Sequence, residues 1–257
     1  MRGTIGVGRY LDQAMASPQT EAVTPRAVRT GMSPERHAGG ARLVMTQISK
    51  RFPAAEVPVL DGIDLTLYAG QTASVRGQNG AGKTTLLRTV AGLIKPDAGR
   101  IELDGIDSEK RSRAYRPRIG LLSAGNTGLF ARLSVAHHLS YFARLALLPA
   151  DRRRHVVERA LDGFELREFA ARRADRLSMG QRQRVRAAIT FLHDPDVVLL
   201  DEPQTSLDAE GIALLESAVA ELLERGGTAL WCSPAGFHEE GDFDQALVLE
   251  GGRLRPE

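Results

Sequence analysis

The sequence contains the segment Gly77-Gln78-Asn79-Gly80-Ala81-Gly82-Lys83-Thr84, which matches the pattern G-x-x-x-x-G-K-[ST]. Glycines allow the backbone to curl, so that successive N–H groups point inward toward phosphate oxygens. Lys83 would bring a mobile positive charge to the β- and γ-phosphates, and the hydroxyl of Thr84 can bind Mg²⁺. Together with Thr85, the segment therefore predicts a binding site for a nucleoside triphosphate such as ATP.

The residues around this segment alternate between strand and helix patterns. Thr72–Arg76 reads as a short strand, and Lys83–Ile94 reads as a helix because its apolar residues recur at helical spacing. Further strands are expected at Leu43–Ser49, Val59–Leu67, Arg100–Leu103, Val197–Leu200, Thr228–Cys232 and Ala246–Glu250, and further helices after the N-caps Ser134 and Ser178 and around Ile212–Leu223. This order predicts an α/β fold with a largely parallel sheet.

The composition restricts the class of protein. Of 257 residues, 42% are hydrophobic and 26% are charged, which excludes a collagen, a coiled coil or a wholly disordered chain. The apolar stretches are shorter than the roughly 20 residues that cross a bilayer, so we expect no membrane span. The net charge of +2 is too small to indicate nucleic-acid binding. Cys232 is the single cysteine, which favours a reducing compartment.

The first part of the chain differs from the rest. Residues 1–42 mix Gly, Pro, Ser, Thr and scattered charges without a sustained strand or helix period. We expect a disordered N-terminal extension there, or an upstream start chosen in place of Met45. The folded domain is then expected to cover residues 43–257.

Two adjacent carboxylates follow the apolar run Val197–Leu200. A strand buried on both faces would hold Asp201 at its C-terminal edge, where open α/β sheets bind ligands, and Asp201 would bind Mg²⁺ directly or through water. Glu202 would point to the other side of the strand, free to orient and polarise an attacking water. The alternative is a solvated acidic strand end, which is disfavoured because a phosphate-binding segment accompanies the pair. We therefore predict that Glu202 is catalytic.

A third motif lies before the carboxylates and reads Leu177-Ser178-Met179-Gly180-Gln181. Taken alone, Ser178 and Gly180 indicate an N-cap and a turn. Together with the two motifs above, the pattern L-S-x-G-Q resembles the signature of the ATP-binding cassette (ABC) family. The resemblance covers about Leu43–Leu254. It implies a RecA-like P-loop NTPase core with an antiparallel β subdomain and an inserted helical subdomain at about residues 125–177.

The resemblance also implies how two chains would share ATP. Family members form head-to-tail dimers, here a homodimer or a heterodimer, in which the phosphate segment and carboxylates of one subunit face Ser178 and Gly180 of the other. Phe52 would occupy the position of the aromatic residue that stacks on adenine, with a core phenylalanine at a strand end as the alternative. Asp208 would lie in the loop that crosses to the partner's site. ATP binding would close the dimer, and hydrolysis would open it.

Two residues that the family usually carries are missing. Ala124 or Gly125 stands where a Gln is usual, and Asn126 is the nearest amide. Pro234 takes the place of the usual switch histidine, which His238 could replace only in a rearranged loop. Losing a group that positions the water or the γ-phosphate typically costs about 10²–10⁴ in rate. We therefore predict slow ATP hydrolysis.

The favoured function is the ATP-hydrolysing motor subunit of an ABC transporter. It would dock through Ser123–Phe130 on a separate integral membrane permease, at the cytoplasmic face of the plasma membrane. The segment Leu122–Leu147 is similar to the ATPase subunits of bacterial exporters for drugs, lipids and polysaccharides, which favours export.

Two alternatives remain open. One is a soluble ABC ATPase without a permease, which the arginine clusters Arg152–Arg154, Arg172-Arg173 and Arg182–Arg186 would favour if they bound nucleic acid. Acidic residues are interspersed among them, however, so we interpret the clusters as solvated helix faces and expect no nucleic-acid partner. The other alternative is a regulatory subunit that binds ATP but barely hydrolyses it, beside a competent partner in a heterodimer.

Overall fold

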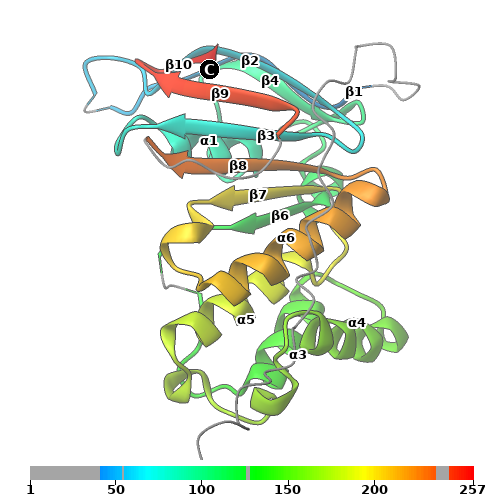
Figure 1. The fold of residues 1–257 in the computed structure, drawn as a ribbon. Coiled ribbons are helices and arrows are strands. Elements are labelled where there is room, and N and C mark those ends of the chain that lie inside the picture. Colours follow the sequence, from blue (N-terminus) through cyan, green and yellow to red (C-terminus); the bar gives the residue numbers. More distant parts are fainter. Residues whose placement is uncertain (1–40, 54, 126–127, 236–242) are drawn as a thin grey trace, which may run out of the picture.

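The computed structural model of the chain describes residues 41–53, 55–125, 128–235 and 243–257, which form two sheets with helices packed around the larger one (Figure 1). The strands are β1 (Ala41–Lys50), β2 (Leu60–Tyr68), β3 (Thr72–Gly77), β4 (Ala98–Leu103), β5 (Ile106–Asp107), β6 (Ile119–Leu122), β7 (Val197–Asp201), β8 (Thr228–Pro234), β9 (Gln245–Glu250) and β10 (Arg253–Pro256). The α-helices are α1 (Lys83–Val90), α2 (Ser112–Tyr115), α3 (Val135–Leu145), α4 (Ala150–Gly163), α5 (Met179–Phe191) and α6 (Ala209–Glu224). Short 3-10 turns are η2 (Arg116–Arg118), η3 (Arg167–Phe169), η4 (Ala174–Arg176) and η5 (Pro203–Thr205).

The larger sheet has the strand order β10-β9-β3-β8-β7-β6. Strands β9, β3, β8, β7 and β6 run parallel, and β10 returns antiparallel to β9 across the turn at Gly251-Gly252. The largely parallel sheet predicted from the sequence is therefore confirmed. Because parallel strands end at one edge, the ends of β3, β6, β7 and β8 meet there, and this edge carries the candidate site.

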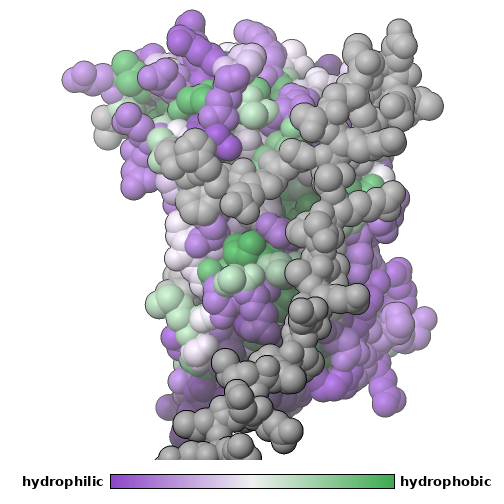
Figure 2. All heavy atoms as spheres, in the orientation of Figure 1, coloured by the Kyte–Doolittle hydropathy of each residue, from purple (hydrophilic) through white to green (hydrophobic). Residues whose placement is uncertain are grey.

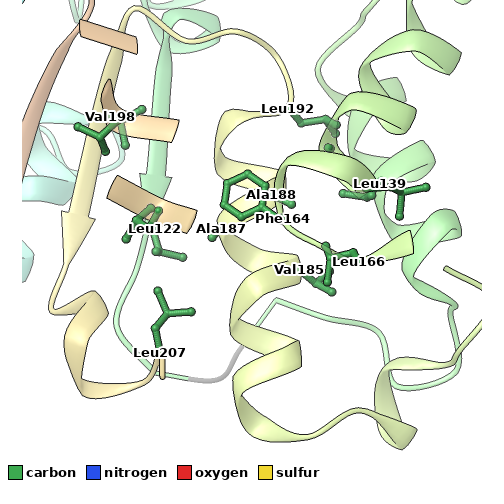
Figure 3. Packing of buried hydrophobic residues seen from close by; sticks show 14 of the residues in the cluster. Leu122, Leu139, Phe164, Leu166, Val185, Ala187, Ala188, Leu192, Val198 and Leu207 are labelled. Carbon is green, nitrogen blue, oxygen red and sulfur yellow. The ribbon is translucent and has the colours of Figure 1, made fainter. Parts of the chain in front are cut away.

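Strand β7 is buried on both faces, as predicted, and it separates two apolar cores. Val197 and Leu199 pack into the core shared with the smaller sheet and α1, whereas Val198 and Leu200 pack into the core shared with α3–α6. Figure 3 shows the second core, with α5 between the larger sheet and the helices α3 and α4. Asp201 ends a strand whose backbone is fixed from both sides.

The smaller sheet is antiparallel and has the order β2-β1-β4-β5. Strand β1 begins at Ala41, two residues before the expected start of ordered structure, because Arg42 forms ion pairs with Asp104 and Asp196. The remaining part of the expected extension, residues 1–40, lies outside the described residues.

Two helices begin where the sequence predicted, and one helix ends earlier than predicted. Ser134 and Ser178 are the N-caps of α3 and α5, as predicted, and each side chain accepts a hydrogen bond from the backbone N–H three residues later. The predicted extension of α1 to Ile94 is wrong, since α1 ends at Val90. Gly92 has a φ of 67°, and this left-handed residue terminates the helix even though the apolar spacing continues.

The interpretation of Arg182–Arg186 as a solvated face is also wrong for two of its arginines. Arg184 and Arg186 are 8% and 9% exposed, because their guanidinium groups find acceptors on other parts of the chain. By contrast, polar side chains dominate the visible surface of the lower, helical part of the molecule, whereas apolar side chains gather at mid-height (Figure 2).

Candidate nucleotide-binding site

The glycine-rich segment links the end of β3 to the start of α1, as predicted. Gly82 is the N-cap of α1 with a φ of 106°, and a Cβ there would lie 2.9 Å from Val59, so both backbone conformation and space require glycine. Gln78, Asn79 and Gly80 are exposed, and Thr84 and Thr85 lie in the first turn of α1. The segment therefore presents an open loop in front of a helix N-terminus, the arrangement that binds phosphate.

Lys83 is buried in this loop, with 5% of the residue exposed. Its Nζ donates to the carbonyl oxygens of Gly77 at 2.8 Å and of Gln78 at 3.2 Å. It also lies 3.1 Å from Oε1 of Glu202. The Lys83–Glu202 pair joins the phosphate-binding segment to the second carboxylate after β7.

Asp201 lies at the end of β7 and is 3% exposed. Its Oδ2 accepts a hydrogen bond from the hydroxyl of Thr84 at 2.9 Å, which brings together the two predicted ligands of Mg²⁺. Its Oδ1 is buried and has no hydrogen-bond partner among the described residues. An unsatisfied carboxylate oxygen beside a hydroxyl is the donor set that Mg²⁺ prefers, so these residues fit the ion.

The sequence predicted that the Glu202 side chain would be free beside the strand, but in the structure it is paired with Lys83. It leaves β7 with φ 51° and ψ 49°, and its N–H donates to the carbonyl oxygen of Cys232 at 2.9 Å. This left-handed turn directs its carboxylate toward Lys83, with 23% of the side chain exposed. Glu202 thus lies at the site and pairs with Lys83.

The signature residues form the N-terminus of α5. Ser178 and Gln181 make a capping box, in which Gln181 N–H donates to Ser178 Oγ at 3.2 Å and Ser178 N–H donates to Gln181 Oε1 at 3.0 Å. Leu177 is buried, whereas Met179 is 53% exposed. This helix end is therefore rigid and open on one side.

Asp208 approaches the signature from the N-terminus of α6. A Cβ at Gly180 would lie 2.9 Å from Asp208 Oδ2, and Arg184 lies 3.3 Å from the same oxygen. The N–H of Gly211, which donates to Asp208 Oδ1 at 2.8 Å, lowers the pKa of this carboxyl, and Arg184 adds to the effect. Sequence reasoning missed Arg184, whose guanidinium also pairs with Glu210.

The positions where the family usually has a Gln and a His, at Ala124 or Gly125 and at Pro234, also lie at the edge where the parallel strands end. Pro234 ends β8 directly beside Gly77, so it faces the start of the phosphate loop but offers no donor. The N–H of Ala124 lies 3.5 Å from Asp201 Oδ2. Asn126 and His238, the possible substitutes, lie outside the described residues.

Phe52 lies in a turn just after β1 and is 38% exposed, so it is not the core residue that was the alternative. Lys50 lies 5.8 Å from the centroid of its ring. Val59 links this turn to the phosphate loop: its N–H donates to the carbonyl oxygen of Lys50 at 2.7 Å, and a Cβ at Gly82 would lie 2.9 Å from its carbonyl oxygen. An exposed ring near this loop is compatible with stacking on a base.

Comparison with known proteins identifies the family. A family model described as "ABC transporter" matches residues 60–205, which include the phosphate segment, the signature and both carboxylates. The chain belongs to the ABC transporter family. None of the helices formed by the described residues has the length and hydropathy needed to cross a membrane. The family match identifies the chain as an ATP-binding subunit of the ABC ATPase type, a class that binds ATP, dimerises and works with membrane permeases.

Similarity to individual proteins supports the same family assignment. The chain is 33% identical over 214 residues to the ABC transporter ATP-binding protein NatA of Bacillus subtilis, covering 82% of this chain and 87% of NatA. It is 38% identical over 197 residues to the daunorubicin resistance ATP-binding protein DrrA3 of Streptomyces coeruleorubidus, covering 76% of this chain but only 61% of DrrA3. In fold it resembles the ATP-binding cassette MJ0796, a dimer bound to ADP and Pi, with a TM-score of 0.70, 23% identity, and coverage of 84% of this chain and 97% of MJ0796.

Proposed function

We propose that the chain is the motor subunit of an ABC exporter, and that residues 43–257 form its ATPase domain with helical residues at about 125–177. It would bind Mg-ATP on the Gly77–Thr85 segment and hydrolyse it slowly. One observation carries this proposal: Lys83, Thr84, Asp201 and Glu202 meet at one sheet edge, with the contacts Lys83–Glu202 at 3.1 Å and Thr84–Asp201 at 2.9 Å. These are a phosphate-binding cation, two ligands for a divalent ion and a candidate base.

The geometry supports a sequence of events at these residues. The γ-phosphate of ATP would draw Nζ of Lys83 away from Glu202, because the phosphate offers more negative charge than a single carboxylate. Mg²⁺, when bound to Thr84 and Asp201, would neutralise phosphate charge. Glu202 would then accept a proton from the attacking water as general base.

The expected rate is low because two positioning groups are lacking. Ala124 has no side-chain amide for the water, and Pro234 has no hydrogen-bond donor for the γ-phosphate. Positioning groups of this kind contribute about 10²–10⁴ in rate. The variant Glu202→Gln should remove the candidate base and lower the rate of phosphate release at saturating Mg-ATP by at least about 10²-fold relative to the wild type. Equal phosphate release from both proteins would refute the assignment of Glu202.

The active form would be a head-to-tail dimer, either of this chain or with a related one. The N-terminus of α5, with the hydroxyl of Ser178 and its backbone N–H groups, would complete the partner's nucleotide site. The exposure of Met179 at 53% leaves this end of the helix open to a partner. Asp208 would cross the interface, and Phe52 would stack on the adenine.

A separate permease would dock beside the nucleotide site. A groove of about 750 Å³ lies between the end of β6 and the helices α3 and α5. It is bordered by Leu93, Leu145 and Leu147, which are 62%, 57% and 86% exposed, and by Arg116. An apolar permease segment with an acidic side chain would complement this surface and would hold the chain at the inner face of the plasma membrane.

Affinity purification from detergent-solubilised membranes tests the permease. The wild-type chain should retain an integral membrane protein, and Leu147→Glu should lose it because the charge would enter the groove. Val57→Glu is the matched control, since Val57 is an exposed apolar residue (70%) away from the groove. Purification without a membrane protein would favour a soluble ABC ATPase instead.

Export is the proposed direction, supported by the relative DrrA3, which is named for daunorubicin resistance. A strain that lacks the chain should accumulate the cargo inside the cell. If the chain served import instead, the same strain would be depleted of the cargo. Comparing small molecules in the two cell extracts by mass spectrometry distinguishes these outcomes.

A further inference from the structure

Arg186 lies on α5 and holds the backbone that follows β6. Its guanidinium donates to the carbonyl oxygen of Ser123 at 2.7 Å and to that of Gly125. Gln183, one turn earlier on α5, accepts from Arg186 at 2.7 Å and donates to the carbonyl oxygen of Gly125 at 3.0 Å. The carbonyl groups on both sides of Ala124 are therefore fixed by α5.

The environment of Arg186 is unusual for an arginine. The residue is 9% exposed, and the oxygens that accept its hydrogen bonds in the described part of the chain are neutral: two backbone carbonyls and one side-chain amide. Burial lowers the pKa of its guanidinium. Removing a cation from water is costly unless its surroundings supply compensating charge. Here the carbonyl dipoles of Ser123 and Gly125 supply it, so the guanidinium and this loop depend on each other.

The residue between these carbonyls faces the candidate metal ligand. The N–H of Ala124 lies 3.5 Å from Asp201 Oδ2, the oxygen that also accepts the hydroxyl of Thr84. A separation of 3.5 Å is at the long limit for a hydrogen bond, so a small displacement of the loop decides whether the bond forms. The guanidinium that holds residues 123 and 125 thereby sets the position of this N–H.

We infer that Arg186 is a positioning residue for Asp201, acting through the backbone of Ser123–Gly125. The inference rests on the proposed function, in which Asp201 binds Mg²⁺. No side-chain amide is available at Ala124 or Gly125, so the loop contributes a backbone N–H to the carboxylate, and a side chain from α5 keeps it in place. Because the signature residue Ser178 caps α5, Arg186 also links that helix to the candidate metal ligand.

The test compares Arg186→Met and Arg186→Lys with the wild-type full-length chain. Arg225→Ala is the matched control, since Arg225 donates to the backbone carbonyl of Pro195 at 2.9 Å away from the site. The first measurement is the Mg²⁺ concentration that gives half-maximal phosphate release. The second is the affinity for a fluorescent ATP analogue in EDTA. The third is hydrogen–deuterium exchange of the Ala124 amide without nucleotide.

Arg186→Met should raise the half-maximal Mg²⁺ concentration about fivefold, the equivalent of one lost hydrogen bond. Affinity for the nucleotide in EDTA should stay within about twofold, and exchange should become faster at Ala124 but not across the sheet. Arg186→Lys keeps the charge but reaches only one carbonyl, so it should give a smaller shift in the same direction. The control should match the wild type in all three measurements.

A folded Arg186→Met with the wild-type Mg²⁺ dependence and wild-type exchange at Ala124 would overturn the inference. If Arg186→Met exchanges rapidly throughout the chain, it is unfolded, and Arg186→Lys decides: an unshifted Mg²⁺ dependence in that variant overturns the inference as well. Failure of the wild type to bind or hydrolyse Mg-ATP would instead refute the proposed function, so the two failures are distinguishable.

Discussion

Replacing Glu202 by glutamine should strengthen the binding of ATP. In the structure Nζ of Lys83 lies 3.1 Å from Oε1 of Glu202, so a phosphate would compete with this carboxylate for the lysine. The variant Glu202→Gln removes the negative charge but keeps the shape of the side chain. The free energy of the Lys83–Glu202 pair then no longer opposes binding.

The size of the effect follows from the burial of the pair. Exposed ion pairs contribute about 0.2–1 kcal/mol. Only 5% of the Lys83 side chain and 23% of the Glu202 side chain are exposed, so we take the upper end of that range. About 1 kcal/mol corresponds to about a fivefold change in dissociation constant. Glu202→Gln should therefore bind ATP about fivefold more tightly than the wild type.

Removing a carboxylate also relieves its direct repulsion of the phosphates, and a double-mutant cycle with Lys83→Ala separates the two effects. Lys83→Ala alone should weaken binding by about 10–100-fold through loss of a charge-assisted contact. In the Lys83→Ala background, Glu202→Gln can relieve only the repulsion. The assay is titration with a fluorescent ATP analogue in EDTA, which prevents hydrolysis, at constant ionic strength. An equal gain with and without Lys83 would show that the pair does not oppose binding.

Three further predictions concern the dimer, a buried histidine and the sheet. Ser178→Arg should leave nucleotide binding by the monomer unchanged but prevent ATP-driven dimerisation in sedimentation experiments, because a bulky cation would enter the interface; a persisting ATP-dependent dimer would refute the shared site. Burial lowers the pKa of His138 from 6.5, and its ring accepts the N–H of Phe130 on Nε2 at 2.8 Å. Below pH 6.5 the unfolded chain therefore binds a proton at His138 that the folded chain does not bind, so the melting temperature should fall as the pH drops. His138→Gln should reduce this pH dependence, which thermal melts over a pH series would measure. Leu199→Ala, at a fully buried position, should lower the free energy of unfolding by about 2–5 kcal/mol in urea titrations, and a smaller loss would show that the core can collapse around the cavity.

The parts of the fold that the sequence predicted depend on local rules. Four apolar residues before Asp201 indicated a strand buried on both faces, and Val197–Leu200 do alternate between the two cores. Ser178 could be recognised as an N-cap because capping involves only residues within one turn. The glycine-rich segment fixes its own loop and the start of α1 for the same reason.

The parts that the sequence missed depend on residues far apart in the chain. Arg184 and Arg186 were interpreted as part of a solvated face because acidic residues are interspersed among the arginine clusters. Their partners come instead from the loop after β6 and from the start of α6. The early end of α1 is different because its cause is local: Gly92 can adopt the left-handed conformation that stops a helix, whereas the prediction followed the apolar spacing to Ile94.

The pairing of Lys83 with Glu202 also joins residues that are far apart in the chain, and it has a consequence for catalysis. A motif records which residues meet a triphosphate, but it does not record how those residues pair with one another. In this structure the cation and the candidate base lie 3.1 Å apart and neutralise each other. If Glu202 is the base, as proposed above, Lys83 would have to move away from it first, and the γ-phosphate carries the charge that would draw Lys83 away. ATP would thus release the base that cleaves it, whereas ADP, which lacks that phosphate, would leave more of the Lys83–Glu202 pair intact.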